Sequence, residues 1–165
     1  MTVPREVIDR VRARLRQDAE SLPIEAAIAR VQASADGLHA VAGSIPIERF
    51  DDAPATGGWS PAKVLAHAVE SNVRRAQQIL YVALSGELPA DEPVTLPAER
   101  DALIASHQDA LDSLYIHVRD ADPDAFILTT WPHSIFGELN WHEWLLFLEL
   151  HTLDHARQLE ATSNA

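Results

Sequence analysis

The chain contains no cysteine among its 165 residues. This absence excludes disulfides, thiolate-bound metal sites and a cysteine nucleophile, so any metal ion must be held by histidines and carboxylates. Glycine is also scarce, at six residues, whereas apolar residues recur at helical spacing among many Ala, Leu, Glu and Arg. Such a composition is typical of an α-helical protein and argues against a β-rich fold.

Positive charge is in short supply as well. The chain carries 13 Lys and Arg against 25 Asp and Glu, a formal net charge of −12, and a surface of that sign repels phosphate backbones. The sequence has no apolar run long enough to span a membrane, and its first residues alternate charge with Val and Leu, unlike a signal peptide. We therefore expect a cytoplasmic protein that binds neither nucleic acid nor membranes.

The periodicity predicts an all-α fold with four long helices and one short N-terminal helix. The clearest helix start is Ser60-Pro61, a capping residue followed by proline at the first helical position. Asn140 and Glu143 form a variant of the capping box. We expect an N-terminal amphipathic helix within residues 1–20 and a helical bundle over 21–162. The expected helices cover residues 3–19, 23–41, 61–84, 97–120 and 140–161, joined by connections at 44–58, 86–97 and 122–137, whose lengths leave the topology open.

Two histidines are the strongest candidates for metal ligands. His151 and His155 are four residues apart, which places both rings on one side of a helix, together with the apolar Trp144 and Phe147. A buried imidazole must be neutral or paired, and metal coordination satisfies it. Such a pair also arises by chance on helices, so a third ligand is needed.

His67 is the candidate for that third ligand. It shares an inward stripe of the Ser60 helix with Val64 and Ser71, and Arg74 is a further candidate for the same stripe. Polar side chains on a stripe that should be apolar indicate a cavity rather than a packed seam.

Several other polar residues are candidates for the wall of such a cavity. Ser71 lies on the His67 stripe, Gln158 on the His151 side of the last helix, and His133 in the last connection, where it could border a pocket mouth. His107 lies on an inner helix face, where a buried histidine with hydrogen-bonded ring nitrogens is favoured over a metal ligand. His142 is expected to face away from His151 and toward solvent.

The sequence resembles the DinB-like superfamily of small bacterial helical bundles. The similarity covers about residues 22–161 and depends on the order and spacing of its pieces together. It implies a four-helix bundle, commonly a homodimer, that binds one divalent ion such as nickel or zinc through His67, His151 and His155. The matching segments are 57–71 and 131–161, with Trp59-Ser60, His67, Phe136-Gly137, His151, His155 and Arg157-Gln158-Leu159 at the positions of the family pattern.

Three neutral imidazoles would leave the ion with its full charge and an open coordination position, as in catalytic sites. The segment HTLDH has no Glu after its first histidine and is therefore not the zinc-protease motif. Glu70 is a weak candidate for a base or for a residue that orients a ligand ring, although an ordinary salt-bridged carboxylate is favoured. Asp154 is not expected to be a ligand.

Two functions are compatible with these residues. Because the superfamily includes thiol-dependent transferases and isomerases, the resemblance implies a metal-dependent enzyme that uses a low-molecular-weight thiol such as bacillithiol or mycothiol, or else a hydrolase, acting on a small molecule. The alternative is a dimeric, stress-associated protein that binds metal or a small ligand without turnover. An apolar back face of the last helix would support an extra contact, unless the N-terminal helix covers it; this face contains Leu145, Leu146, Leu150 and Leu153.

Overall fold

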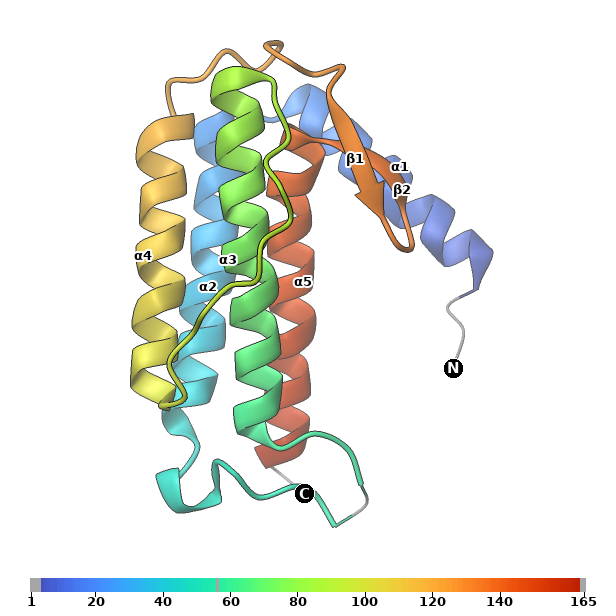
Figure 1. Ribbon diagram of the computed structural model, residues 1–165. Helices are drawn as coiled ribbons and strands as arrows, with labels where there is room; N and C mark the ends of the chain where they lie inside the picture. Colours follow the sequence, from blue (N-terminus) through green and yellow to red (C-terminus); the bar gives the residue numbers. More distant parts are fainter. Residues whose placement is uncertain (1–3, 56, 164–165) are drawn as a thin grey trace.

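The computed structural model describes residues 4–55 and 57–163, and Figure 1 traces its helices. The prediction of a helical bundle with an additional N-terminal helix is confirmed, apart from one small β-hairpin. The expected helix boundary at residue 3 lies outside the described residues. The elements are α1 (Arg5–Ser21), α2 (Ile24–Ser44), the short 3-10 helix η1 (Ile47–Arg49), α3 (Pro61–Ser85), α4 (Arg100–Val118), β1 (Thr130–His133), β2 (Gly137–Asn140) and α5 (Trp141–Ser163).

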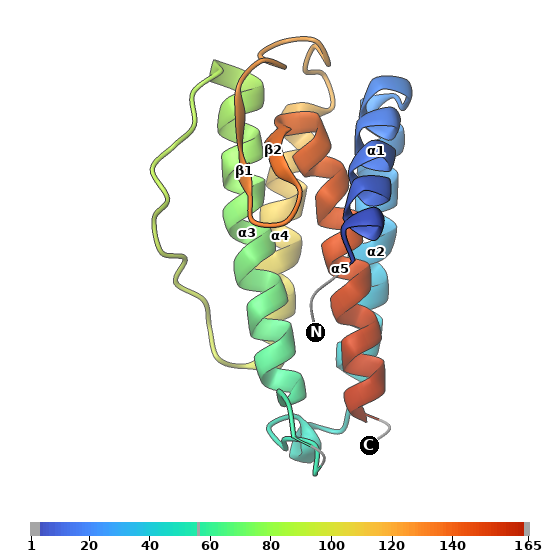
Figure 2. The same ribbon diagram turned by 90° about the vertical axis from the view of Figure 1, so that its right-hand side faces the viewer.

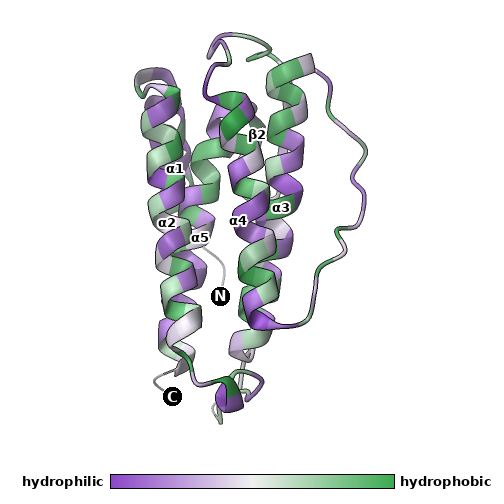
Figure 3. Ribbon diagram, turned by 90° about the vertical axis from the view of Figure 1, so that its left-hand side faces the viewer, coloured by the Kyte–Doolittle hydropathy of each residue, from purple (hydrophilic) through white to green (hydrophobic). Residues whose placement is uncertain are grey.

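Helices α2 to α5 form the bundle. Helix α5 packs against α2 and α3, and α4 packs against α3 and α2. The segment between α3 and α4 runs back along the length of the bundle, so these two helices point the same way (Figures 1 and 2). This crossover settles the topology that connection lengths had left open. Hydrophobic and hydrophilic residues alternate along each helix in the hydropathy colouring of Figure 3, as burial of one helix face requires.

The two predicted helix starts have the expected capping contacts. The backbone N–H of Lys63 donates to Ser60 Oγ over 3.3 Å, and Pro61 occupies the first turn of α3. The N–H of Glu143 donates to Asn140 Oδ1, and the N–H of Asn140 donates to Glu143 Oε2, both over 2.9 Å. These contacts satisfy backbone donors that a helix N-terminus leaves free.

Helix α1 lies against α5 on the outside of the bundle (Figure 2). Leu15 is buried in the shared core. Asp18 accepts from Arg14 and Arg30; burial opposes its charge, yet the two guanidinium groups hold the pKa of Asp18 below its ordinary value. Arg30 also pairs with Glu149 of α5 at 2.8 Å. Helix α1 therefore packs against α5, and Leu15 shares a hydrophobic cluster with Leu145 and Leu146 of the apolar back face.

The segment 122–137, expected as a connection, contains the start of an antiparallel hairpin. Trp131 pairs with Leu139 across β1 and β2, and both side chains are buried. Gly137 adopts a φ of 75°, which suits glycine, at the turn. Strands of four residues are too short to show an alternating pattern in the sequence.

Helix α4 begins at Arg100, three residues later than predicted from Pro97. No side chain caps the N-terminus of α4. The guanidinium of Arg100 instead donates to the carbonyl of Ile45, the residue that follows α2. None of the described helices is long and apolar enough to cross a membrane.

Candidate metal centre

The structure brings His67, His151 and His155 together between α3 and α5. One ring nitrogen of each lies within 4.8 Å of the corresponding nitrogens of the other two. The His151 and His155 rings are 4.5 Å apart between centroids, and the His67 ring is 5.0 Å from that of His155. His155 is buried, His151 half-buried and His67 exposed, with Trp59 packed edge-on against the His67 ring.

Hydrogen bonds decide where the protons sit on two of these imidazoles. His151 Nδ1 lies 2.9 Å from Asn72 Oδ1, and His155 Nδ1 lies 3.0 Å from Gln158 Oε1. An amide oxygen only accepts, so both Nδ1 atoms carry hydrogen and donate. In the neutral imidazoles each Nε2 atom therefore carries no hydrogen and has a free lone pair.

Hydrogen bonds to Thr152 and His107 fix the orientation of the Asn72 amide. The Thr152 hydroxyl donates to the carbonyl of Leu148 and so accepts from Asn72 Nδ2 over 2.8 Å. The same amide nitrogen donates to His107 Nε2 over 3.0 Å, so His107 Nδ1 carries the proton that it donates to His39. A buried chain of hydrogen bonds thus presents the Asn72 oxygen to His151.

The two bare nitrogens face each other at 3.1 Å. Two lone pairs at that separation repel, and a cation between them removes the repulsion. Metal–nitrogen bonds of about 2.0–2.1 Å in a tetrahedral site place two ligand nitrogens about 3.3 Å apart. The pair therefore fits a metal ion in spacing and in protonation, and His67 lies within reach as a third ligand.

Electrostatics also keeps two of these histidines in the neutral form that metal coordination requires. Burial, reinforced by the neighbouring imidazoles of His155 and His67, lowers the pKa of His151 to about 3. Burial likewise lowers the pKa of His155. Both rings are neutral at pH 7, so a metal ion would not have to displace a proton from either.

The three histidines line a pocket of about 810 Å³. Helices α1, α3 and α5 and the β1–β2 turn contribute its wall, which is largely aromatic and aliphatic. Ser71 and His133, both expected at a pocket, lie on this wall. The lining residues are Val11, His67, Ser71, Arg75, Pro132, His133, Ser134, Ile135, Phe136, Trp144, Phe147, Leu150, His151, Asp154 and His155.

Two residues expected at the pocket are placed elsewhere. His107 is fully buried one layer behind the wall, where it bonds Asn72 and His39, and burial lowers its pKa to about 3. Gln158 does not line the pocket but accepts from His155 and orients that ring. His142, expected in solvent, is buried and stacks on Trp141. These differences arise because helix phase alone does not reveal which neighbour covers a face.

The weak catalytic candidate Glu70 does not line the pocket. It pairs with Arg74, which in turn contacts Asp91 and does not line the pocket either. Arg75 lines the pocket wall instead, a position that was not predicted from the sequence. Its position eight residues after His67 continues the His67–Ser71 series at four-residue steps, a signal that the sequence did contain. Asp154, which was not expected to be a metal ligand, lies on the pocket wall.

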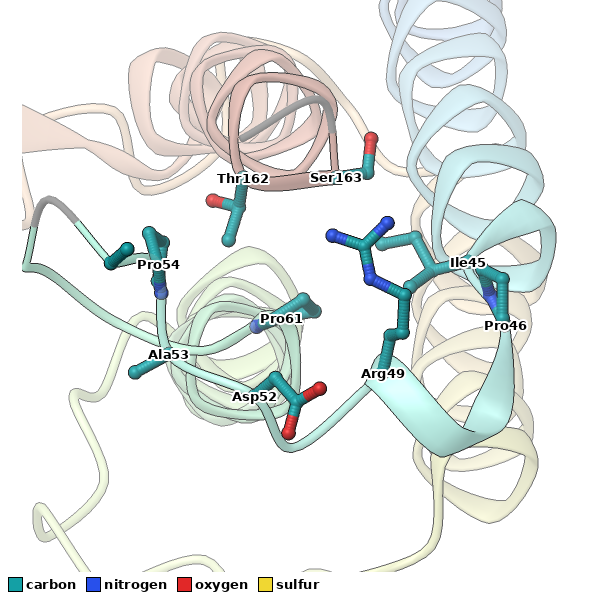
Figure 4. A pocket seen from close by; sticks show the side chains of 10 residues that line it. Ile45, Pro46, Arg49, Asp52, Ala53, Pro54, Pro61, Thr162 and Ser163 are labelled. Carbon is teal, nitrogen blue, oxygen red and sulfur yellow. The ribbon is translucent and has the colours of Figure 1, made fainter.

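A second cavity, of about 330 Å³, lies where η1 and the start of α3 meet the end of α5. Figure 4 shows Arg49, Asp52, Thr162 and Ser163 around it. No trio of potential metal ligands gathers there among the residues that the structure describes. The histidine pocket is therefore the better candidate for a functional site.

The role of Asn72 leads to a first prediction. Replacing Asn72 with leucine would leave His107 Nε2, the Thr152 hydroxyl and His151 Nδ1 without their shared partner. We expect about 2–4 kcal/mol of lost stability and a loss of metal affinity of about 10- to 100-fold, because the His151 ring is no longer held. Urea unfolding and zinc competition would measure both.

The matched control for that substitution is Thr152→Val. It removes one hydroxyl of the same network while leaving the Asn72–His151 contact in place. Metal affinity should change much less than in Asn72→Leu. Equal losses of metal affinity in the two variants would show that Asn72 does not act through His151.

Comparison with known proteins agrees with this architecture. The chain is similar to TT2238, a protein whose crystal structure is described as a four-helix bundle, with 26% identity, a TM-score of 0.60, and coverage of 83% of this chain and 98% of TT2238. No curated protein matches the sequence. The family model of the DinB superfamily matches residues 30–159, which include all three clustered histidines. The chain therefore belongs to the DinB superfamily.

Proposed function

We propose that this protein binds one divalent metal ion, such as nickel or zinc, through His67, His151 and His155, and that the metal-bound form is an enzyme acting on a small molecule. A thiol-dependent S-transferase or isomerase is the reaction class that we favour. The observation that carries the proposal is the pair of unprotonated Nε2 atoms facing each other at 3.1 Å. Their Nδ1 protons are engaged by Asn72 and Gln158, as the outer nitrogens of metal-binding histidines usually are.

The ligand set suits catalysis better than a structural role. Three neutral imidazoles supply no negative charge and fill only three positions, so a bound ion would act as a Lewis acid toward a thiol, a water or a substrate oxygen. Imidazole suits zinc, nickel, cobalt and copper alike. The protein's own contribution is to hold the rings in one tautomer and one orientation.

The pocket beside the histidines has the size and character of a small-molecule site. Its volume of about 810 Å³ lies within the range of about 300–1,000 Å³ that such sites occupy. Trp144, Phe136 and Phe147 supply the apolar part of its wall. Asp154 is the only carboxylate on the wall among the described residues, and we propose it as the acceptor of a proton from the entering thiol or water.

The spectrum of the cobalt-loaded protein tests this function. Adding a small thiol such as 2-mercaptoethanol should produce a strong sulfur-to-cobalt charge-transfer band, and the His151→Ala protein should show none. The zinc form should then transfer a thiol to model epoxides or halonitroarenes. A thiol band without turnover would favour the non-catalytic alternative, a metal-binding or ligand-binding protein. Absence of both the band and turnover would exclude the thiol-dependent reaction class.

A further inference from the structure

We propose that Arg75 and His133 form a carboxylate-binding subsite in the histidine pocket, so that the molecule bound there is a small organic acid. Its reactive end would lie at the three histidines and its carboxylate at Arg75. The anion subsite stands on its own contacts, whereas its meaning for catalysis rests on the proposed function.

Arg75 is a half-buried charge that forms no ion pair with a carboxylate in the described part of the chain. Its guanidinium carbon lies 4.4 Å from the centroid of the Trp144 ring, and one of its nitrogens donates to Gln78 Oε1 over 2.6 Å. The guanidinium has five N–H donors, so most of its capacity remains for a ligand.

The neighbouring arginine shows how unusual this arrangement is. Arg74 pairs with both Glu70 and Asp91 and does not line the histidine pocket. Burial and the adjacent Arg74 charge together lower the pKa of Arg75, although Asp91 opposes the effect. The stacking on Trp144 compensates part of the cost of partial burial. An anion at the guanidinium would compensate the rest, because a bidentate carboxylate matches its geometry.

His133 supplies a second donor on the same wall. Its Nδ1 accepts from the backbone N–H groups of Ile135 and Phe136 over 3.0 and 3.1 Å. The proton of the neutral ring must therefore be on Nε2, which has no hydrogen-bond partner elsewhere in the described part of the chain. Burial and the nearby Arg75 charge lower the pKa of His133 to about 4, so it remains a neutral donor.

Aromatic rings link this subsite to the metal centre. The Phe147 ring lies 4.4 Å from that of His133 and 5.7 Å from that of His151, measured between centroids. A ligand would thus meet N–H donors at one end, a phenyl surface in the middle and the metal-ligating histidines at the other end. A carboxylate fits better than a phosphate dianion, since Arg75 is the only positively charged side chain on the wall among the described residues.

The subsite can be tested without the metal. Calorimetry on metal-free protein would compare 3-phenylpropionate with its neutral amide, 3-phenylpropanamide. We expect the acid to bind at least about tenfold more tightly, because it gains a charged hydrogen bond to Arg75. Arg75→Gln should abolish that preference, Arg75→Lys should retain part of it, and Arg74→Gln should retain all of it. Circular dichroism and thermal unfolding would confirm that each variant is folded.

Several outcomes would overturn the proposal: no detectable binding of the acid, equal affinities for acid and amide, or an equal effect of Arg74→Gln and Arg75→Gln. Tighter binding of inorganic phosphate than of 3-phenylpropionate would replace the carboxylate with a phosphate ligand. Cobalt-loaded protein separates this result from the proposed function. A thiol band with the same half-saturation for 3-mercaptopropionate and 3-mercaptopropanamide would retain the function and reject the subsite. A preference for the acid that depends on Arg75, without any thiol band, would retain the subsite and reject the thiol-dependent function.

Discussion

Replacing His151 with alanine is expected to abolish stoichiometric metal binding. The substitution removes a nitrogen that faces His155 Nε2 at 3.1 Å and whose ring is held by Asn72. The loss of affinity should exceed the roughly 10- to 100-fold effect of losing only a hydrogen-bond partner of a ligand. Elemental analysis after loading with zinc or nickel, followed by competition with a chromophoric chelator, would measure it.

His117→Ala is the matched control for this substitution. His117 is exposed and donates a hydrogen bond to the carbonyl of Ser113 within its own helix, away from the clustered histidines, so its loss should leave metal content unchanged. His67→Ala should weaken binding less than His151→Ala, because His67 is exposed and makes no hydrogen bond that pre-orients its ring within the described part of the chain. Full metal content in His151→Ala, or none in the parent protein loaded under the same conditions, would contradict the proposed metal site.

Acidification is expected to destabilise the metal-free protein steeply between pH 6.5 and 4.5. His107 is fully buried and its pKa in the folded protein is about 3, whereas an unfolded histidine has an ordinary pKa near 6.5. Between pH 6.5 and about 3, His107 is therefore protonated in the unfolded state but neutral in the folded state. The His107 contribution is fully present above pH 6.5 and falls by about 1.4 kcal/mol for each pH unit as the pH decreases toward 3. His151 acts in the same direction.

Urea unfolding of chelator-treated protein at pH 7.5, 6.5, 5.5 and 4.5 would test this dependence. Keeping the pH above 4.5 limits the contribution of Asp and Glu, whose ordinary pKa values are lower. His107→Gln, which cannot titrate but retains a donor and an acceptor, should show a shallower slope by about 1.4 kcal/mol per pH unit. His117→Gln should keep the slope of the parent protein. An unchanged slope in His107→Gln would refute the assignment.

Local signals in the sequence were sufficient for most of the fold. Ser60-Pro61 and the Asn140–Glu143 pair start helices where predicted, because capping depends only on residues within one turn. The β1–β2 hairpin was missed, since four-residue strands carry little periodicity. The start of α4 was placed too early at Pro97, because the Arg100–Ile45 contact that accompanies the actual start joins residues far apart in the chain.

The candidate site was predictable in part for the same reason. The spacing of His151 and His155 on one helix determines that their rings share a side, whereas joining His67 to them required the family resemblance. Arg75 and its stacking on Trp144 could not be anticipated, because that contact depends on how α3 lies against α5. The expected pocket residues His107 and Gln158 instead lie in positions from which they support other side chains.

By itself, the sequence determined the helical class, the absence of cysteine chemistry and the periodicity that aligns two histidines, because each of these follows from composition or from contacts within a few turns. Only the tertiary structure decided that α3 and α4 run parallel, that α1 lies against α5, and that Asn72 directs a proton onto His151 Nδ1. These features join residues far apart in the chain, and their geometry exists only once helices have packed. The bare nitrogens that make the site fit a metal ion are a product of that packing.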